Sequence, residues 1–352
     1  MSRRRLGIGL FFVVTALVAG ALAWLAWDRY QGFAHGPLSG IDEGETLVVE
    51  RGDSFLRVLE KLREAGVTDG HRTEWQLLAR RLDAGGRLQV GEYELEPGMS
   101  ASELLVKMRE GRVIRHRFTI VEGWNIRELR AALAQASPLL QETPGMDDAA
   151  LMAALDRTGT HPEGRFLPET YLYTRGDSDL DLLARAADAL DATLQEAWDN
   201  RADGLPLETP EEALILASII EKETGLASER ERIAGVFSRR LQRGMRLQTD
   251  PTVIYGMGSR FDGNIRRRDL QADTPYNTYT RDGLPPTPIA MPGAAAIRAA
   301  TRPADGDELY FVAIGDGSGA HVFSRTYSEH QSAVREYVRR YRQRFGQGAR
   351  GE

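Results

Sequence analysis

The chain has 352 residues, of which 42% are hydrophobic and 27% charged, so it is long enough for two folded domains and too apolar to be mainly disordered. Its net charge of −6 argues against a nucleic-acid-binding protein, because no broad basic field is present to neutralise phosphates. The absence of cysteine excludes disulfides and thiolate catalysis.

The N-terminus predicts a membrane anchor. Arg3, Arg4 and Arg5 precede an uncharged apolar run over residues 6–27, which is long enough to cross a bilayer as a helix. A cleavable signal peptide is the alternative, but the run is long for one and no clear Ala-x-Ala cleavage site follows it. By the positive-inside rule, residues 1–5 form a cytoplasmic tail and the chain after residue 28 lies outside the cytoplasm.

After a linker over residues 28–45, three segments share one pattern: a short β-rich run, a Gly-x-Ser or Gly-x-Asn turn, and a helical apolar period. Two of the turns are followed by a glutamate at capping-box spacing, which predicts where the helices begin. These pairs are Ser100 with Glu103 and Asn125 with Glu128. The unequal spacing of the three segments excludes a solenoid of fixed period.

The first of these segments resembles the LysM family, which binds peptidoglycan and chitin. The resemblance depends on the order Val49, Gly52, Asp53, Ser54 and Phe55. A complete LysM needs a second strand after two helices, and residues 88–95 (LQVGEYEL) supply it in this interpretation. We expect a small LysM-like α+β domain over residues 46–115, which is either a glycan-binding module or a scaffold.

The remaining sequence predicts a larger α+β domain over residues 116–346, followed by a tail over 347–352. A connecting region over residues 137–163 contains one short helix, and an amphipathic helix follows near residues 177–202. A capping box of Ser228 and Glu231 predicts the start of another helix. The final strands, LYFVAI and HVFS, are predicted to form a hairpin, and the Arg-rich stretch 335–344 is interpreted as the solvated face of a last helix.

Residues 210–225, PEEALILASIIEKETG, predict the central buried helix. Proline and two acids begin it, and its apolar residues cover nearly the whole circumference. Glu221 and Glu223 at its end either pair with Lys222 near the surface or serve a catalytic site. Two residues apart on a helix are about 200° apart, so only one of them faces a given cleft. Glu223 shares its face with apolar residues that would raise its pKa, which favours it as a proton donor over Glu221.

Downstream loops carry the amides, hydroxyls, carboxylate and rings that line sugar-binding sites, although well-capped turns have the same composition. The predicted substrate-binding residues are Gln248, Thr249, Asp250, Tyr255, Asn277 and Tyr279. The six histidines form no metal-binding motif. His321 is interpreted as structural, with a hydrogen bond to the substrate as the alternative.

In this order, the strings ASIIEKETG, MRLQTDPTVIYGMG, PYNTYTRDGLPPTPI and HVFS resemble the endolytic murein transglycosylase (YceG-like, MltG) family. The resemblance spans nearly the full chain. It implies a lyase of the bacterial inner membrane with a periplasmic catalytic domain, no metal or cofactor, and penicillin-binding proteins as candidate partners. The family has one catalytic glutamate in its E-K-E-T segment. The motif fits Glu223 or Glu221, and the Thr224 that follows Glu223 favours Glu223.

A single carboxyl group is sufficient for a lytic transglycosylase, because the C6 hydroxyl of N-acetylmuramic acid is the nucleophile and the product has a 1,6-anhydro end. A hydrolytic muramidase would need a second carboxylate, for which Asp250 is the first candidate. The third hypothesis is an anchored wall-binding scaffold that acts through the LysM-like region.

Overall fold

The structure, a computed structural model, describes residues 2–345 and contains two compact units, each of mixed helix and strand as the sequence predicts. The first unit holds the chain up to His116 together with Tyr173–Gly176, and the second holds Arg117–Leu172 and the chain from Asp177 onward. The predicted tail, residues 347–352, lies outside the described residues.

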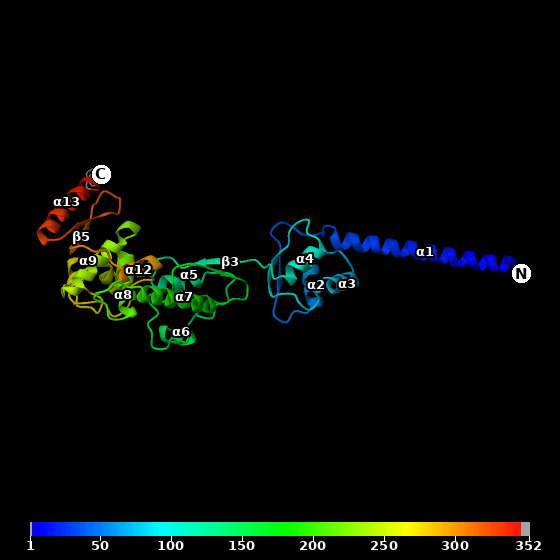
Figure 1. Ribbon diagram of the computed structural model, residues 1–352, viewed down its shortest axis with the longest axis horizontal. Coiled ribbons are helices and arrows are strands. Elements are labelled where there is room, and N and C mark those ends of the chain that lie inside the picture. Colours follow the sequence, from blue (N-terminus) through cyan, green and yellow to red (C-terminus); the bar gives the residue numbers. More distant parts are fainter. Residues whose placement is uncertain (1, 346–352) are drawn as a thin grey trace. The chain divides into compact units, whose positions relative to one another are not determined.

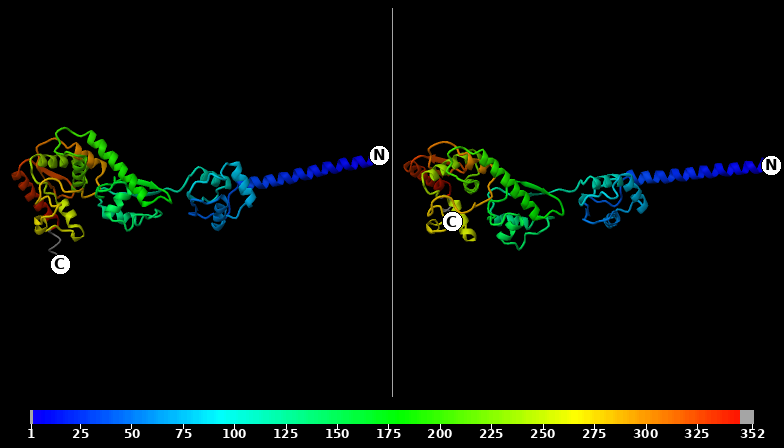
Figure 2. Two further views of the ribbon diagram at one scale, coloured as in Figure 1. Left: turned by 90° about the horizontal axis from the view of Figure 1, so that it is seen from below. Right: turned by 60° about the horizontal axis from the view of Figure 1, so that its bottom comes forward.

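The apolar N-terminal run forms α1 (Ser2–His35), one continuous helix that extends from the first unit (Figures 1 and 2). Its side chains from Leu10 to Trp27 are exposed, and its length and apolar composition are sufficient to cross a membrane. The helix continues through the first part of the expected linker, because Tyr30 and Ala34 in its last turns are buried in the core of the unit. Irregular chain therefore begins after His35, later than predicted.

The LysM-like region has the element order β1 (Thr46–Val49), α2 (Phe55–Glu64), α3 (Arg72–Arg81), β2 (Gly91–Glu94) and α4 (Ala101–Arg109). β1 and β2 pair antiparallel, with Thr46 opposite Glu94, so the two-strand, two-helix order expected from the sequence is present. Ser54 caps α2, and the predicted capping box of Ser100 and Glu103 begins α4.

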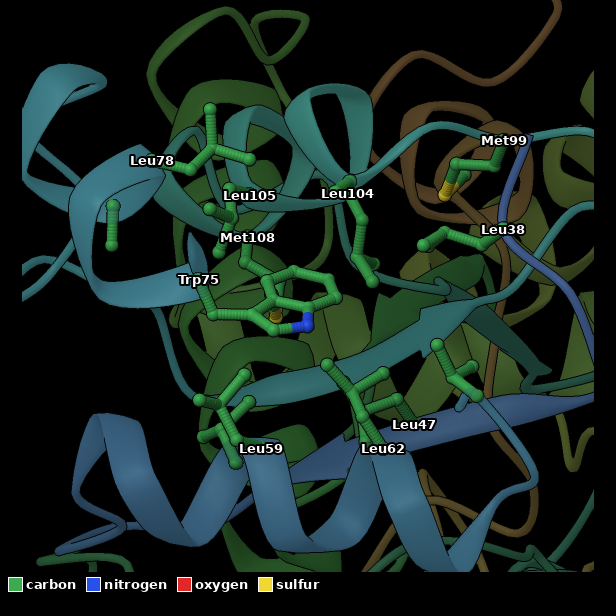
Figure 3. Close-up of a cluster of buried hydrophobic side chains, with 14 of the residues drawn as sticks. Leu38, Leu47, Leu59, Leu62, Trp75, Leu78, Met99, Leu104, Leu105 and Met108 are labelled. Carbon is green, nitrogen blue, oxygen red and sulfur yellow. The ribbon is translucent and has the colours of Figure 1, made fainter. Parts of the chain in front are cut away.

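Trp75 lies at the centre of the hydrophobic core of this unit, surrounded by Met108 and by leucines from α2, α3, α4 and β1 (Figure 3). Its side chain is 1% exposed, and the indole N–H donates to the Asp69 carbonyl at 2.9 Å. Tyr173–Gly176 belongs to this unit through the ion pair of Arg175 with Glu92 at 3.1 Å and the stacked rings of Tyr173 and His116.

The strands β3 (His116–Thr119) and β4 (Thr170–Tyr173) form a two-stranded sheet near the start of the second unit. His116, the first residue of β3, and Tyr173, the last residue of β4, are assigned to the first unit. Between these strands lie α5 (Ile126–Leu133), which begins at the predicted capping box of Asn125 and Glu128, and α6 (Asp148–Ala154). The amphipathic helix α7 (Asp179–Asp199) follows β4.

The core of the second unit is built around α8 (Pro210–Glu223), in which every residue from Ala213 to Ile220 is buried. The helix packs against α7, α9 (Arg230–Gln242), α10 (Asp250–Met257) and α12 (Ala294–Thr301), and Figure 1 shows α8, α9 and α12 gathered together. Packing against four other helices explains why its apolar residues occupy nearly the whole circumference, as predicted. Each buried leucine or isoleucine there contributes about 1.5–3 kcal/mol.

The chain after α10 passes through a short turn η2 (Gly258–Arg260) and α11 (Arg267–Gln271). It then forms the predicted hairpin of β5 (Tyr310–Ala313) and β6 (His321–Ser324) and ends in α13 (Tyr327–Phe345), which packs on both strands.

The capping box predicted for Ser228 and Glu231 was wrong. A turn of 3-10 helix, η1 (Ala227–Glu229), precedes α9, so Ser228 lies within that turn and Glu229 takes the N-cap position without a side-chain cap. The Glu229 carboxylate instead accepts from the backbone N–H of His321 at 3.0 Å and contacts His321 Nδ1 at 2.7 Å. The Glu229 carboxylate therefore binds the distant hairpin and does not cap its own helix, and the structural role of His321 stays a prediction.

Candidate active site

Glu223 is the last residue of α8, at the point where the buried helix reaches a pocket. Its carboxylate accepts a hydrogen bond from the Thr249 hydroxyl. Burial raises the pKa of Glu223 to about 7, with the Thr249 hydrogen bond opposing this rise and the nearby charge of Asp250 adding to it. A carboxyl group with such a pKa is suited both to donate and to accept a proton near neutral pH.

Thr249 is held in place by a network of threonines. Its side chain is buried and it occupies the N-cap position of α10, yet its hydroxyl donates to Glu223 and makes no bond to its own helix. The backbone N–H of Thr249 donates to the Thr278 hydroxyl at 3.1 Å, and the Thr252 hydroxyl donates to the Thr249 carbonyl at 2.8 Å. The hydroxyls of Thr252 and Thr278 lie 2.9 Å apart, which closes the network around the Thr249 backbone.

The pocket beside Glu223 has a volume of about 370 Å³, and both carboxylates and aromatic rings line it. The loop before α10 and the start of that helix supply Gln248 and Asp250, and the segment before α12 supplies Tyr279. The hairpin and α13 supply rings. The lining residues that could contact a ligand are Glu223, Arg240, Gln248, Asp250, Tyr279, Tyr310, Tyr327 and His330. Enzymes that cleave carbohydrates commonly combine carboxyl groups, which transfer protons, with aromatic rings on which the sugars stack.

Asp250 is the second carboxylate of the pocket. Its Oδ1 accepts a hydrogen bond from the Tyr279 hydroxyl at 2.6 Å, and burial together with this carboxylate raises the pKa of Tyr279. Tyr279 therefore remains a neutral donor, and the Asp250 charge acts on Glu223 from the same pocket.

Glu221 lies in a different environment from Glu223, as the helical geometry predicts. Its Oε2 accepts from the backbone N–H of Gly293 at 3.0 Å, and its Oε1 is 4.0 Å from the Arg230 guanidinium. Burial raises the pKa of Glu221, the Gly293 hydrogen bond lowers it and the charge of Glu122 raises it. These contacts connect α8 to the start of α12, and Glu221 does not line the pocket of Glu223.

Two of the predicted substrate-binding residues lie away from this pocket. Asn277 is 1% exposed: its amide nitrogen donates to three backbone carbonyls, and its Oδ1 accepts from the Tyr279 N–H, so it organises the loop that carries Tyr279. Tyr255, on the far part of α10, hydrogen-bonds to Glu163 and packs edge-on against Tyr276. The structure brings together Glu223, Gln248, Thr249, Asp250 and Tyr279, and places the other two elsewhere.

Glu163 is a buried carboxyl group that the sequence did not single out. It is completely buried and its oxygens accept from the Ile126 backbone N–H at 3.1 and 3.2 Å. Burial raises the pKa of Glu163 to about 7, while hydrogen bonds from Ile126 and Tyr255 lower it. Its contacts join the start of α5 to α10, the helix whose first turn carries Asp250.

Three further lining residues of the pocket were not predicted from the sequence: Tyr310, His330 and Arg240. Tyr310 stacks on His330 with ring centroids 5.2 Å apart, and the Arg240 guanidinium lies 5.4 Å from the Tyr310 ring centroid. Arg240 also donates to Gln248 Oε1 at 2.6 Å and so fixes the amide that faces the pocket. These residues come from α9, β5 and α13, and no local motif connects them. Among residues 2–345, no group of three or more His, Asp or Glu side chains is arranged to hold a metal ion.

Comparison with known proteins finds a matching family model, curated relatives and a related solved structure. The model of the YceG-like family matches residues 47–336. The endolytic murein transglycosylase of Bacillus subtilis (strain 168) is 30% identical over 307 residues, which cover 82% of this chain and 84% of that protein. The endolytic murein transglycosylase of Streptococcus pneumoniae (serotype 2, strain D39) is 26% identical over 93% of this chain, which spans 65% of that longer protein. A 2.6 Å crystal structure of a yceG-like protein from Listeria monocytogenes is 30% identical, covers 82% of this chain and 98% of its own, and superposes with a TM-score of 0.54.

Proposed function

The chain belongs to the YceG-like family, and from this premise we propose that it is a membrane-anchored endolytic murein transglycosylase in which Glu223 is the one catalytic carboxyl group. Its substrate is the glycan strand of peptidoglycan, cut between N-acetylmuramic acid and N-acetylglucosamine. The observation that carries the assignment is the position of Glu223, whose burial raises its pKa to about 7 in the wall of a pocket.

In the first step, protonated Glu223 donates its proton to the glycosidic oxygen, and the bond between this oxygen and C1 of N-acetylmuramic acid breaks. Burial keeps the carboxyl group protonated up to about pH 7, so the donor is available at neutral pH. The charge of Asp250 contributes to the same effect and also favours the positive charge that develops on the sugar ring.

In the second step, the Glu223 carboxylate removes the proton from the C6 hydroxyl of the same sugar as that oxygen bonds to C1. The product is a 1,6-anhydro end, no water is consumed, and Glu223 is again protonated. The Thr249 hydroxyl donates to Glu223 and holds the carboxylate in one orientation during both steps. Tyr327, which is exposed and lines the pocket, offers a ring on which a sugar can stack.

One observation favours a second candidate reaction, hydrolysis. Asp250 lines the same pocket as Glu223 and has one carboxylate oxygen that the Tyr279 hydroxyl does not occupy. A second carboxylate in this position is the group that a muramidase uses as base or nucleophile. The two reactions give products that differ in mass by one water.

The sequence and the family together support a location in the inner membrane of a bacterium. We propose that α1 is a retained single-pass anchor, with the arginines at its start in the cytoplasm and the two units in the periplasm. The LysM-like domain is proposed to bind glycan beside the catalytic unit, and penicillin-binding proteins are proposed as neighbours that supply new strands.

The experiment that tests this function is mass spectrometry of the products that the full chain, in detergent micelles, releases from uncrosslinked glycan strands. Internal fragments ending in 1,6-anhydro-N-acetylmuramic acid, absent with Glu223→Gln, support the lytic mechanism. Reducing ends support hydrolysis with Asp250. Normal cleavage by Glu223→Gln contradicts the assignment of Glu223, and no cleavage by the wild type supports the scaffold hypothesis.

A further inference from the structure

A second pocket of the catalytic unit, whose charged lining residues are three arginines and Asp269, lies at the other end of α10 from the active site. Its volume is about 370 Å³, and the residues on which the argument depends are Gly256, Met257, Arg260, Arg266 and Arg268. We define these residues as the arginine pocket. Because α10 has eight residues, its first residue, Asp250 in the active-site pocket, and its last turn at the arginine pocket are separated by about 10 Å along the helix.

The chain around this pocket is basic although the whole protein is acidic. Residues 260–269 contain four arginines and two aspartates, a formal charge of 4 − 2 = +2, whereas the full chain carries −6. The overall negative charge is already sufficient to keep the protein soluble. Solubility therefore does not explain why arginines are concentrated in this segment.

The two aspartates leave part of this positive charge unneutralised. Arg266 is paired with Asp262, to which it makes two hydrogen bonds at 2.6 and 3.3 Å. Arg268 lies 3.7 Å from Asp269 but is 77% exposed, and Asp269 directs one oxygen to the Arg266 backbone N–H. Among the residues that the structure describes, no carboxylate forms an ion pair with Arg260, which is also exposed.

We infer that the arginine pocket is an anion-binding subsite, in which Arg260 and Arg268 hold an anionic group carried by the glycan strand whose sugars occupy the active site. This inference rests on the proposed function. Guanidinium groups recognise carboxylate and phosphate oxygens through paired hydrogen bonds, and Met257 with the neighbouring Val253 provides an apolar floor for the part of the ligand that bears the charge.

Two groups on a peptidoglycan strand have this chemistry: the carboxylates of the peptide stem on the lactyl ether of N-acetylmuramic acid, and the diphosphate of a lipid-linked end. The stem recurs on each disaccharide, so a strand lying along α10 presents one close to the scissile bond wherever the enzyme cuts. The diphosphate occurs once per strand and would direct cutting to a fixed position.

The test measures KM and kcat of the full chain in micelles on three preparations of one polymer: lipid-free strands with peptide stems, the same strands stripped of stems by an amidase, and lipid-linked strands. The variant is Arg260→Gln with Arg268→Gln, and the control is Arg243→Gln, an exposed arginine outside the pocket. In the double variant, the ratio of KM on peptide-bearing strands to KM on stripped strands rises about tenfold at unchanged kcat, the order expected for two exposed charge-assisted contacts. This ratio also becomes insensitive to salt.

An increase in the KM of the double variant that is confined to lipid-linked strands supports the subsite with diphosphate as its anion. An increase in KM on stripped, lipid-free strands that equals the increase on peptide-bearing strands overturns the inference. The same KM for the double variant and for Arg243→Gln also overturns it. If the wild type cuts none of the strands, the proposed function fails separately. Cosedimentation of peptide-bearing and stripped strands with the Glu223→Gln protein then still tests the arginine pocket by binding alone.

Discussion

Replacement of Glu223 by glutamine is expected to abolish cleavage and, above neutral pH, to stabilise the protein. The folded state holds this carboxyl group at a pKa of about 7 against an ordinary value of 4.5. Between these values the unfolded chain loses the proton while the folded chain keeps it, so the wild type loses stability as the pH rises from 4.5 to 7. Glutamine has no proton to lose and keeps the bond from Thr249.

The two pKa values differ by about 2.5, which corresponds to a gain of about 3 kcal/mol in the free energy of unfolding of the variant at a pH above 7. Below about pH 4 the variant gains nothing, because the wild-type carboxyl group is protonated in both states. Hydrogen exchange of the amides of α8 measures it directly, because residues Ala213 to Ile220 are all buried and open only with the core of their unit. The exchange of these amides in the Glu223→Gln protein is expected to be about 100-fold slower than in the wild type at about pH 8 and equal to it at about pH 4.

The control is Glu231→Gln, which removes one charge from an exposed position on α9 and is expected to leave exchange within about twofold at both pH values. Equal exchange of the wild-type and Glu223→Gln proteins at about pH 8 would refute the argument, since it would mean that Glu223 ionises in the folded protein without a penalty. Faster exchange of the variant at both pH values would mean that the carboxylate stabilises the pocket.

Three further outcomes are expected. Thr249→Val removes the hydroxyl that lowers the pKa of Glu223, so kcat falls about tenfold or more while the alkaline limb of the pH–rate profile moves to higher pH; Thr249→Ser restores both. Asp250→Asn removes a charge that raises the pKa of Glu223, so the alkaline limb moves to lower pH; complete loss of activity, with reducing ends in the wild-type products, would instead assign Asp250 to hydrolysis. Asn125→Ala removes the N-cap of α5, and urea unfolding should show a loss of about 1 kcal/mol; no loss would mean that tertiary contacts alone begin this helix.

The sequence by itself determined the features that depend on residues a few positions apart. The capping boxes at Ser100 and Asn125 begin helices because a polar side chain and a glutamate three residues later satisfy the free N–H groups of the first turn. The nearly all-apolar circumference of residues 213–220 required a buried helix, and the helical angle between Glu221 and Glu223 required that they face different surroundings.

Only the tertiary structure decided what those surroundings are. Glu223 meets Thr249, which is 26 residues away, and Glu221 meets Gly293, which is 72 residues away. The same long-range packing places Tyr310 of the final hairpin at the pocket. Asn277 is buried by its own loop, whose carbonyls at Asp269, Leu270 and Ala272 accept from its amide nitrogen. A local pattern specifies which side chains share one face of a helix, but the pKa and partners of a side chain depend on segments brought together by folding, so they could not be read from the pattern alone.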